Sequence, residues 1–96
     1  MSSSPITRVV VIQNEHGLHA RPASMVARLA LQFESKIEIE REGRRVDGRS
    51  IMDLLTLGAA KGTELKLVAE GSDAQAAIDA LAELVESGFN EDDAGN

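Results

Sequence analysis

Two short segments of the sequence alternate between charged and apolar side chains, and this alternation limits the possible folds more than any other feature. Within residues 36–40 and 64–69 the apolar positions are Ile37, Ile39, Leu65, Leu67 and Ala69. Alternation with a period of two predicts strands that bury one face and expose the other. Because such a sheet needs helices on its dry face only, the pattern predicts a two-layer α/β sandwich with an open face.

The other elements follow from turn signals and from helical periodicity. Glu42-Gly43 predicts a hairpin turn after residues 36–40, so at least part of the sheet is antiparallel. Further strands are predicted over residues 6–12 and 44–49, and helices over residues 20–33, 50–57 and 74–85. A chain of 96 residues has room for one core of this kind. We expect a flexible leader over residues 1–5, one domain over residues 6–88, and an acidic, disordered tail over residues 89–96.

Composition and charge exclude several classes of function. A net charge of −6 argues against a nucleic-acid-binding protein, which usually carries a basic surface. The chain has no cysteine, which rules out disulfides, thiolate nucleophiles and zinc ribbons. The sequence contains no apolar run long enough to span a membrane and no signal-peptide pattern, so we expect a cytoplasmic protein without membrane insertion. All seven arginines lie within residues 8–49, which indicates an anionic ligand or acidic partner, or simply scattered surface charge.

Residues 14–24, NEHGLHARPAS, contain both histidines of the chain. His19 directly precedes a predicted helix, where unpaired backbone N–H groups and the helix dipole favour an anion. A neutral imidazole there can act as a nucleophile, and Arg21 is close enough in sequence to hold a transferred phosphoryl group. The alternative is that His19 is an exposed cap residue without a chemical role. His16 completes an H-x-x-H spacing, but a metal site needs further ligands, so we interpret it as a loop residue.

The short helix over residues 50–57 carries more apolar residues than it can bury. Ser50 and Asp53 have capping-box spacing, which predicts that Ser50 is the helix N-cap. Leu54 and Leu57 fall on one side of this helix, and Ile51, Met52 and Leu55 form a second cluster. A helix of two turns at the edge of a two-layer domain rarely buries both sides, so one cluster is expected to be exposed.

Two motifs in this sequence resemble those of a known family. Residues 17–23, GLHARPA, resemble the active-site motif of the HPr family, the histidine-containing phosphocarriers of the bacterial phosphoenolpyruvate-dependent sugar phosphotransferase system. Residues 48–58, GRSIMDLLTLG, are similar to the regulatory-serine region of that family. The similarity covers about residues 6–88. It implies a four-stranded antiparallel sheet with three helices on one face.

The resemblance also implies roles for individual residues. His19 matches the histidine that takes a phosphoryl group on Nδ1 from Enzyme I and passes it to Enzyme IIA, and Arg21 matches the arginine that stabilises the phosphate. Ser50 matches a serine that an ATP-dependent HPr kinase/phosphorylase modifies. The matching docking patch for partner proteins is Ile51, Met52 and Leu55. To this surface we add Arg28 and Arg49 as predicted partner-binding residues, because they carry positive charge.

The resemblance therefore implies a phosphohistidine carrier, which takes part in a phosphotransfer chain but does not turn over a substrate by itself. It is expected to be a monomer and to need no cofactor and no metal. Two other functions stay open: a regulatory protein that acts on a transcription factor through phosphorylated Ser50, and a phosphorelay component linked to nitrogen or other metabolism without sugar transport. Asp53, Leu31 and the acidic C-terminal segment depart from the usual family pattern, so partner choice and the Ser50 switch stay open.

Overall fold

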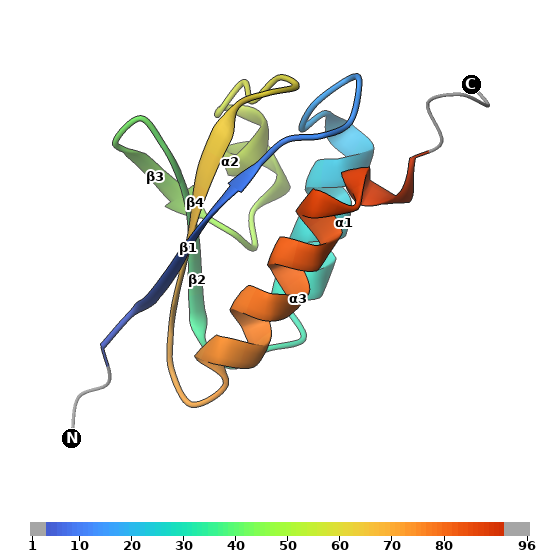
Figure 1. The fold of residues 1–96 in the computed structure, drawn as a ribbon. Helices are drawn as coiled ribbons and strands as arrows, with labels where there is room; N and C mark the ends of the chain where they lie inside the picture. Colours follow the sequence, from blue (N-terminus) through green and yellow to red (C-terminus); the bar gives the residue numbers. More distant parts are fainter. Residues whose placement is uncertain (1–3, 92–96) are drawn as a thin grey trace.

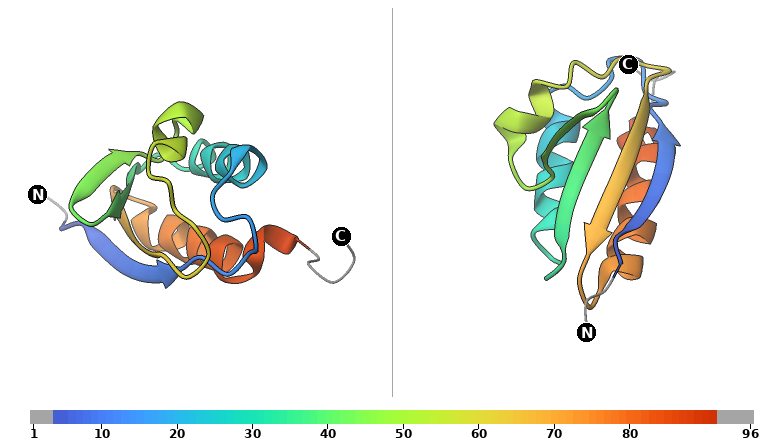
Figure 2. Two further views of the ribbon diagram at one scale, coloured as in Figure 1. Left: turned by 90° about the horizontal axis from the view of Figure 1, so that it is seen from above. Right: turned by 90° about the vertical axis from the view of Figure 1, so that its left-hand side faces the viewer.

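A four-stranded antiparallel sheet forms one layer of the structure, and helices cover one of its faces (Figures 1 and 2). The computed structural model describes residues 4–91. Its elements in chain order are β1 (Ile6–Val11), α1 (Ala20–Ala30), β2 (Lys36–Arg41), β3 (Arg44–Asp47), α2 (Ile51–Leu55), β4 (Glu64–Glu70), α3 (Ala74–Glu86) and the 3-10 helix η1 (Gly88–Asn90). The strand order is β1-β4-β2-β3, and every neighbouring pair is antiparallel. The predicted fold class is therefore confirmed. Within residues 4–91 no helix is long and apolar enough to cross a membrane.

The two faces of the sheet differ as the alternation predicts. Ile39 pairs with Leu67 and Ile37 with Ala69, and all four side chains are buried beneath the helices. On the other face charged side chains pair across strands: Arg45 lies 2.8 Å from the Glu40 carboxylate and 3.5 Å from that of Glu38. Most of the buried apolar side chains of the strands lie on one face, and α1 and α3 pack on that face. The outer face is mainly charged but also carries Val9 and Val68.

The first helix is shorter than the predicted span of residues 20–33. It ends at Ala30: the Leu31 N–H still bonds to the carbonyl four residues back, but those of Gln32 and Phe33 bond to carbonyls three residues back. Asp73 explains the ending, because its carboxylate accepts hydrogen bonds from the backbone N–H groups of Glu34 and Ser35 and from the Ser35 hydroxyl. The serine hydroxyl is the main cause that holds the pKa of Asp73 below its ordinary value. Asp73 occupies the N-cap position of α3, but within residues 4–91 its side chain makes no capping hydrogen bond with that helix, and its carboxylate instead fixes the turn that leads into β2.

The segment after α3 is ordered through Glu91. Gly88–Asn90 form η1, and the Phe89 side chain is fully buried in the core. Phe89 adopts a positive φ of 60°, which turns the chain back toward the N-terminus of α1. The predicted disordered tail is therefore wrong for Phe89, Asn90 and Glu91, because a buried aromatic side chain anchors them. Residues 92–96 and the first three residues of the predicted leader lie outside the described residues.

The loop between β1 and α1 is held close to the loop before β4. The Leu18 N–H donates to the Ala59 carbonyl at 2.8 Å, and Gly17 has a φ of +66°. A Cβ on Gly17 would lie 2.4 Å from the Ala59 oxygen. Glycine at this position is therefore required both by the backbone conformation and by the close approach of the second loop.

We expect the variant Gly17→Ala to lose about 2–4 kcal/mol of unfolding free energy, from the left-handed backbone and the clash together. Gly43→Ala is the matched control, because Gly43 also has a positive φ, of 84°, but a Cβ at this position would meet no neighbouring atom of residues 4–91 within 4 Å. It should lose only the conformational part, about 1–2 kcal/mol. Urea denaturation measures both values, and equal losses in the two variants would contradict the proposed close contact.

Candidate functional site

His19 occupies the N-cap position of α1, with its ring directed away from the helix backbone. Its φ and ψ are −85° and −167°, and within residues 4–91 the ring accepts no capping hydrogen bond from the helix. The first two N–H groups of the helix, those of Ala20 and Arg21, have no backbone acceptor in this part of the chain. The side chain of His19 is 41% exposed. The structure thus combines an accessible imidazole with free N–H groups at the positive end of a helix dipole.

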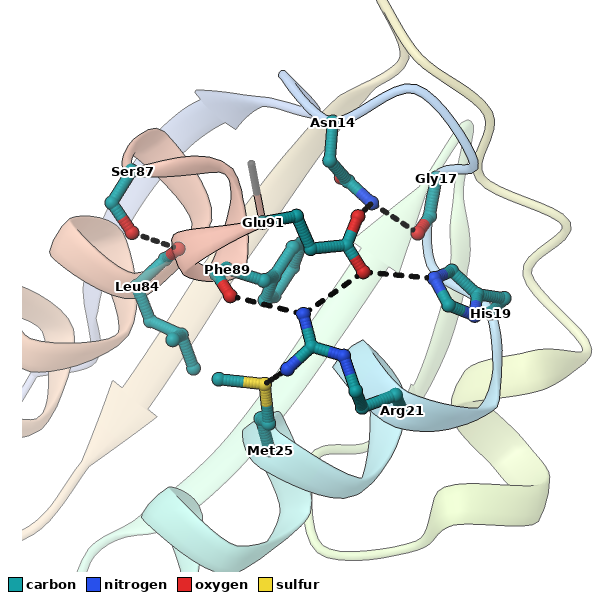
Figure 3. A network of polar contacts seen from close by, with 9 residues as sticks. All are labelled: Asn14, Gly17, His19, Arg21, Met25, Leu84, Ser87, Phe89 and Glu91. Carbon is teal, nitrogen blue, oxygen red and sulfur yellow. Dashed lines mark hydrogen bonds and ion pairs between the residues drawn. The ribbon is translucent and has the colours of Figure 1, made fainter. Parts of the chain in front are cut away.

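The carboxylate of Glu91 lies directly beside this imidazole (Figure 3). Its Oε2 atom is 3.1 Å from His19 Nε2 and accepts a hydrogen bond from Arg21 Nη2 at 3.0 Å. Its Oε1 atom accepts from Asn14 Nδ2, also at 3.0 Å. The C-terminal segment therefore contributes an acidic group to a site that otherwise comes from the β1–α1 loop and α1.

Asn14 and Phe89 hold Glu91 in this position. Asn14 is buried, and the same Nδ2 group that binds Glu91 also donates to the Gly17 carbonyl at 2.8 Å. Burial by itself raises the pKa of Glu91, but the hydrogen bonds from Asn14, Arg21 and His19 outweigh it and hold that pKa below its ordinary value of 4.5. Glu91 is therefore a carboxylate at neutral pH, and its side chain is only 11% exposed.

Arg21 is already engaged in the structure. One terminal nitrogen, Nη2, donates to Glu91 and to the Phe89 carbonyl at 3.3 Å, and the other, Nη1, contacts the Met25 sulfur at 3.2 Å. A thioether sulfur is a weak acceptor, so Nη1 can exchange it for a better one. Arg21 thus links α1 to the C-terminal segment through Nη2, and its Nη1 nitrogen can still donate to another acceptor.

Asn14 and Glu91 were not predicted from the sequence to be site residues. Glu91 stands in an acidic stretch that is typical of a solvated tail, and it lies 72 positions after His19 and 70 after Arg21. The available signal was Phe89, because a large aromatic side chain two positions before an acidic residue can anchor it. Asn14 offered no comparable signal, since asparagine is common in loops.

His16 lies in the β1–α1 loop, exposed to solvent, and its ring packs edge-on against that of His19. The ring centroids are 6.0 Å apart, and the planes are nearly perpendicular, at 89°. Within residues 4–91 no group of three histidine or acidic side chains is placed to hold a metal ion.

The other predicted residues occupy a second surface on and around α2. Ser50 is the N-cap of α2, as predicted, and its hydroxyl oxygen accepts from the Asp53 N–H at 3.1 Å. Leu54 and Leu57 are buried, which leaves the other cluster of this helix exposed: Ile51, Met52 and Leu55. Met52 is the most exposed of these, at 74%. The prediction that one apolar cluster faces solvent is confirmed.

The two arginines predicted to bind partners differ in their surroundings. Arg28 is exposed on the last turn of α1. Arg49 Nη2 instead donates to the carbonyls of Phe33 and Ser35, at 2.8 and 3.0 Å. The Arg49 side chain therefore ties the start of α2 to the end of α1, and its charge is already used by the chain itself.

Comparisons with known proteins identify relatives over almost the whole chain. The family model PTS-HPr, described as PTS HPr component phosphorylation site, matches residues 6–87. Phosphocarrier protein HPr of Treponema pallidum is 39% identical over 87 residues, which are 91% of this chain and 99% of that protein. The crystal structure of HPr-C-His from Thermoanaerobacter tengcongensis has a TM-score of 0.87 and 41% identity, and the match covers 91% of this chain and 98% of that one.

The open-faced sandwich, together with these matches, defines a phosphocarrier of the phosphotransferase system. The chain belongs to the PTS HPr family. Multiphosphoryl transfer protein of Haemophilus influenzae is also similar, at 36% identity over 94 residues, but the chain spans only 19% of its length. An HPr dimer from Thermoanaerobacter tengcongensis matches with a TM-score of 0.73 and 44% identity, over 85% of this chain and 94% of that one.

The lowered pKa of Glu91 predicts that acid releases the C-terminal segment from the site. Because this pKa is lower in the folded protein than in the unfolded chain, the stabilisation is complete above pH 4.5 and is lost as the pH falls through the lower, folded value. NMR signals of the Phe89 ring should then shift toward those of an exposed ring.

Two variants separate this transition from the titration of Asp73, whose pKa is also lowered. Glu91→Gln removes the titrating group, so its Phe89 signals should not change in this acid range. Asp73→Asn should keep the transition, because Asp73 binds the turn before β2 and not the C-terminal segment. A transition that persists in Glu91→Gln would show that another group causes it.

Proposed function

We propose that His19 is the residue that carries the phosphoryl group, which it accepts from Enzyme I and passes to an Enzyme IIA. The observation that supports this most directly is the position of the His19 ring, exposed at the N-terminus of α1 beside Arg21, in a chain of the PTS HPr family. The proposed carrier works in the cytoplasm and as a monomer. Regulation through Ser50 is proposed in addition to the carrier function and not in place of it. A protein that acted through Ser50 alone would not need a histidine at the N-terminus of α1.

The site supplies what phosphoryl transfer between two histidines requires. Such a transfer depends on in-line positioning and on stabilisation of charge rather than on further covalent chemistry. The N–H groups of Ala20 and Arg21 are free to donate to phosphoryl oxygens. Arg21 Nη1 can add a charge-assisted hydrogen bond when it leaves the Met25 sulfur. The two N–H groups are fixed by the helix backbone and need little reorganisation, so only the Arg21 side chain has to exchange a partner.

The proposed docking surface for Enzyme I and Enzyme IIA is the exposed apolar patch of Ile51, Met52 and Leu55 on α2. The flexible side chain of Met52 suits a surface that must fit more than one partner. Helices α1 and α2 pack against each other, so this patch and the N-terminus of α1 belong to one side of the molecule. Arg28 adds positive charge to α1 on this proposed surface.

Ser50 is the proposed regulatory site within the same surface. Its hydroxyl caps α2, and a phosphate there stays compatible with the N-terminus of a helix. The added charge lies next to Ile51 and Met52, so it should weaken docking through repulsion and desolvation. Asp53 places a carboxylate in the same turn and opposes a second negative charge.

Labelling with phosphoenolpyruvate and purified Enzyme I tests the carrier proposal. The wild-type protein should gain phosphate that is labile in acid and stable in alkali, and His19→Ala should gain none. His16→Ala is the matched control and should be labelled like wild type. Arg21→Ala should be labelled on the order of 10²-fold more slowly, since it removes one preorganised charged donor. Label on His19→Ala, or its absence from the wild type, would refute the proposal.

Labelling with ATP and an HPr kinase/phosphorylase tests the Ser50 proposal. Wild-type protein should gain acid-stable phosphate, and Ser50→Ala should gain none while it loses about 1 kcal/mol of stability with the helix cap. Asp53→Asn keeps the cap geometry but removes the opposing charge, so it should be labelled faster than wild type. Acid-stable label on Ser50→Ala would show that another residue is modified and would refute the Ser50 proposal.

A further inference from the structure

The contact between Glu91 and His19 determines where the proton of the imidazole lies. An ionised carboxylate can only accept hydrogen bonds, so the 3.1 Å contact between Oε2 and Nε2 requires a proton on Nε2. In a neutral imidazole the other nitrogen, Nδ1, then carries the free lone pair. Within residues 4–91 the His19 ring makes no other hydrogen bond than this one. The geometry therefore selects one tautomer, and it leaves Nδ1 as the nucleophilic nitrogen.

We propose that Glu91 is a positioning residue for phosphoryl transfer, which holds the Nε2–H tautomer of His19 and keeps its Nδ1 nitrogen nucleophilic. This inference rests on the proposed function of His19 as the phosphoryl acceptor. In the step, the lone pair of Nδ1 forms the N–P bond while the bond from phosphorus to the donor nitrogen breaks, and its electron pair stays with the donor. The Nε2 proton does not move. The ring becomes a phosphoimidazolium cation, which the adjacent carboxylate stabilises.

The C-terminal segment is built to hold this carboxylate in place. Phe89 is fully buried and anchors the chain two residues before Glu91, Asn14 Nδ2 binds Oε1, and Arg21 Nη2 binds Oε2. Two hydrogen bonds to the carboxylate, besides the contact with His19, restrict its position more than a single surface ion pair does. The same contacts keep Arg21 oriented beside His19.

A competing interpretation is that Glu91 blocks the site, because it is an anion where another anion is to be bound. The contacts favour a supporting role. Glu91 meets the ring at Nε2, so its carboxylate does not occupy the side from which Nδ1 attacks. Its charge is paired with Arg21, and Arg21 still has Nη1 available for a phosphoryl oxygen. The two interpretations predict opposite changes in rate when Glu91 is neutralised.

The test compares Glu91→Gln with Glu83→Gln in the full chain. Glu83 is exposed on α3, so its variant changes the net charge equally without touching the site. Long-range ¹H–¹⁵N NMR at alkaline pH reports the tautomer of His19. Wild type and Glu83→Gln should show mainly Nε2–H, and Glu91→Gln should show a larger share of Nδ1–H. Thermal unfolding of the three proteins checks that they are folded alike, and the tautomer reports on His19 independently of stability.

Phosphorylation by Enzyme I supplies the second measurement. The rate for Glu91→Gln should fall on the order of 10-fold, which is typical when a residue that orients a reacting histidine is lost, and Glu83→Gln should react like wild type. An unchanged tautomer, or a rate equal to or above that of wild type, would overturn the inference. A wild-type protein that is never phosphorylated would instead refute the carrier function, and the NMR result would still decide whether Glu91 selects the tautomer.

Discussion

The burial of one face of the sheet is the constraint on which the rest of the structure depends. Side chains such as Ile39 and Leu67 form the apolar inner face, and α1 and α3 pack on it, whereas the outer face carries most of the charged residues of the strands. Helix α1 then lies beside α3, and η1, which follows α3, lies near the N-terminus of α1. The short turn at η1 is enough to bring Glu91 to His19. The site is thus a consequence of how two helices share one apolar surface.

The parts of the structure that the sequence predicts well are those that depend on local patterns. Alternation identified the strands, and the cap at Ser50 and the exposed apolar cluster of α2 followed from spacing within a few residues. The end of α1 was placed too late, because Asp73, about forty residues away, ends it. Glu91 was missed for the same reason. Contacts between distant segments leave no periodic signal in a single sequence. The contacts of Glu91 with His19 and Arg21 are of this kind.

Neutralisation of charge explains how a carboxylate can lie beside His19, the proposed phosphoryl acceptor. Arg21 pairs with Glu91, so the immediate surroundings of His19 carry little net charge despite the −6 of the whole chain. The free N–H groups of α1 then remain the strongest local donors for an incoming anion. A carboxylate without Arg21 would repel the phosphoryl group, and Arg21 without a partner would be free to move. The ion pair of Arg21 and Glu91 therefore orients both side chains and leaves little net charge beside His19.

The two helix N-termini at His19 and Ser50 show how the same backbone feature can be given different roles. Both expose unpaired N–H groups, which favour an anion. At Ser50 the side chain itself satisfies one of these groups, and Asp53 supplies negative charge within the same turn. At His19 the ring does not cap the helix, and the nearest charged group of the helix is Arg21. Capping therefore stabilises α2 at rest, whereas α1 keeps its donors available for a group that arrives and leaves.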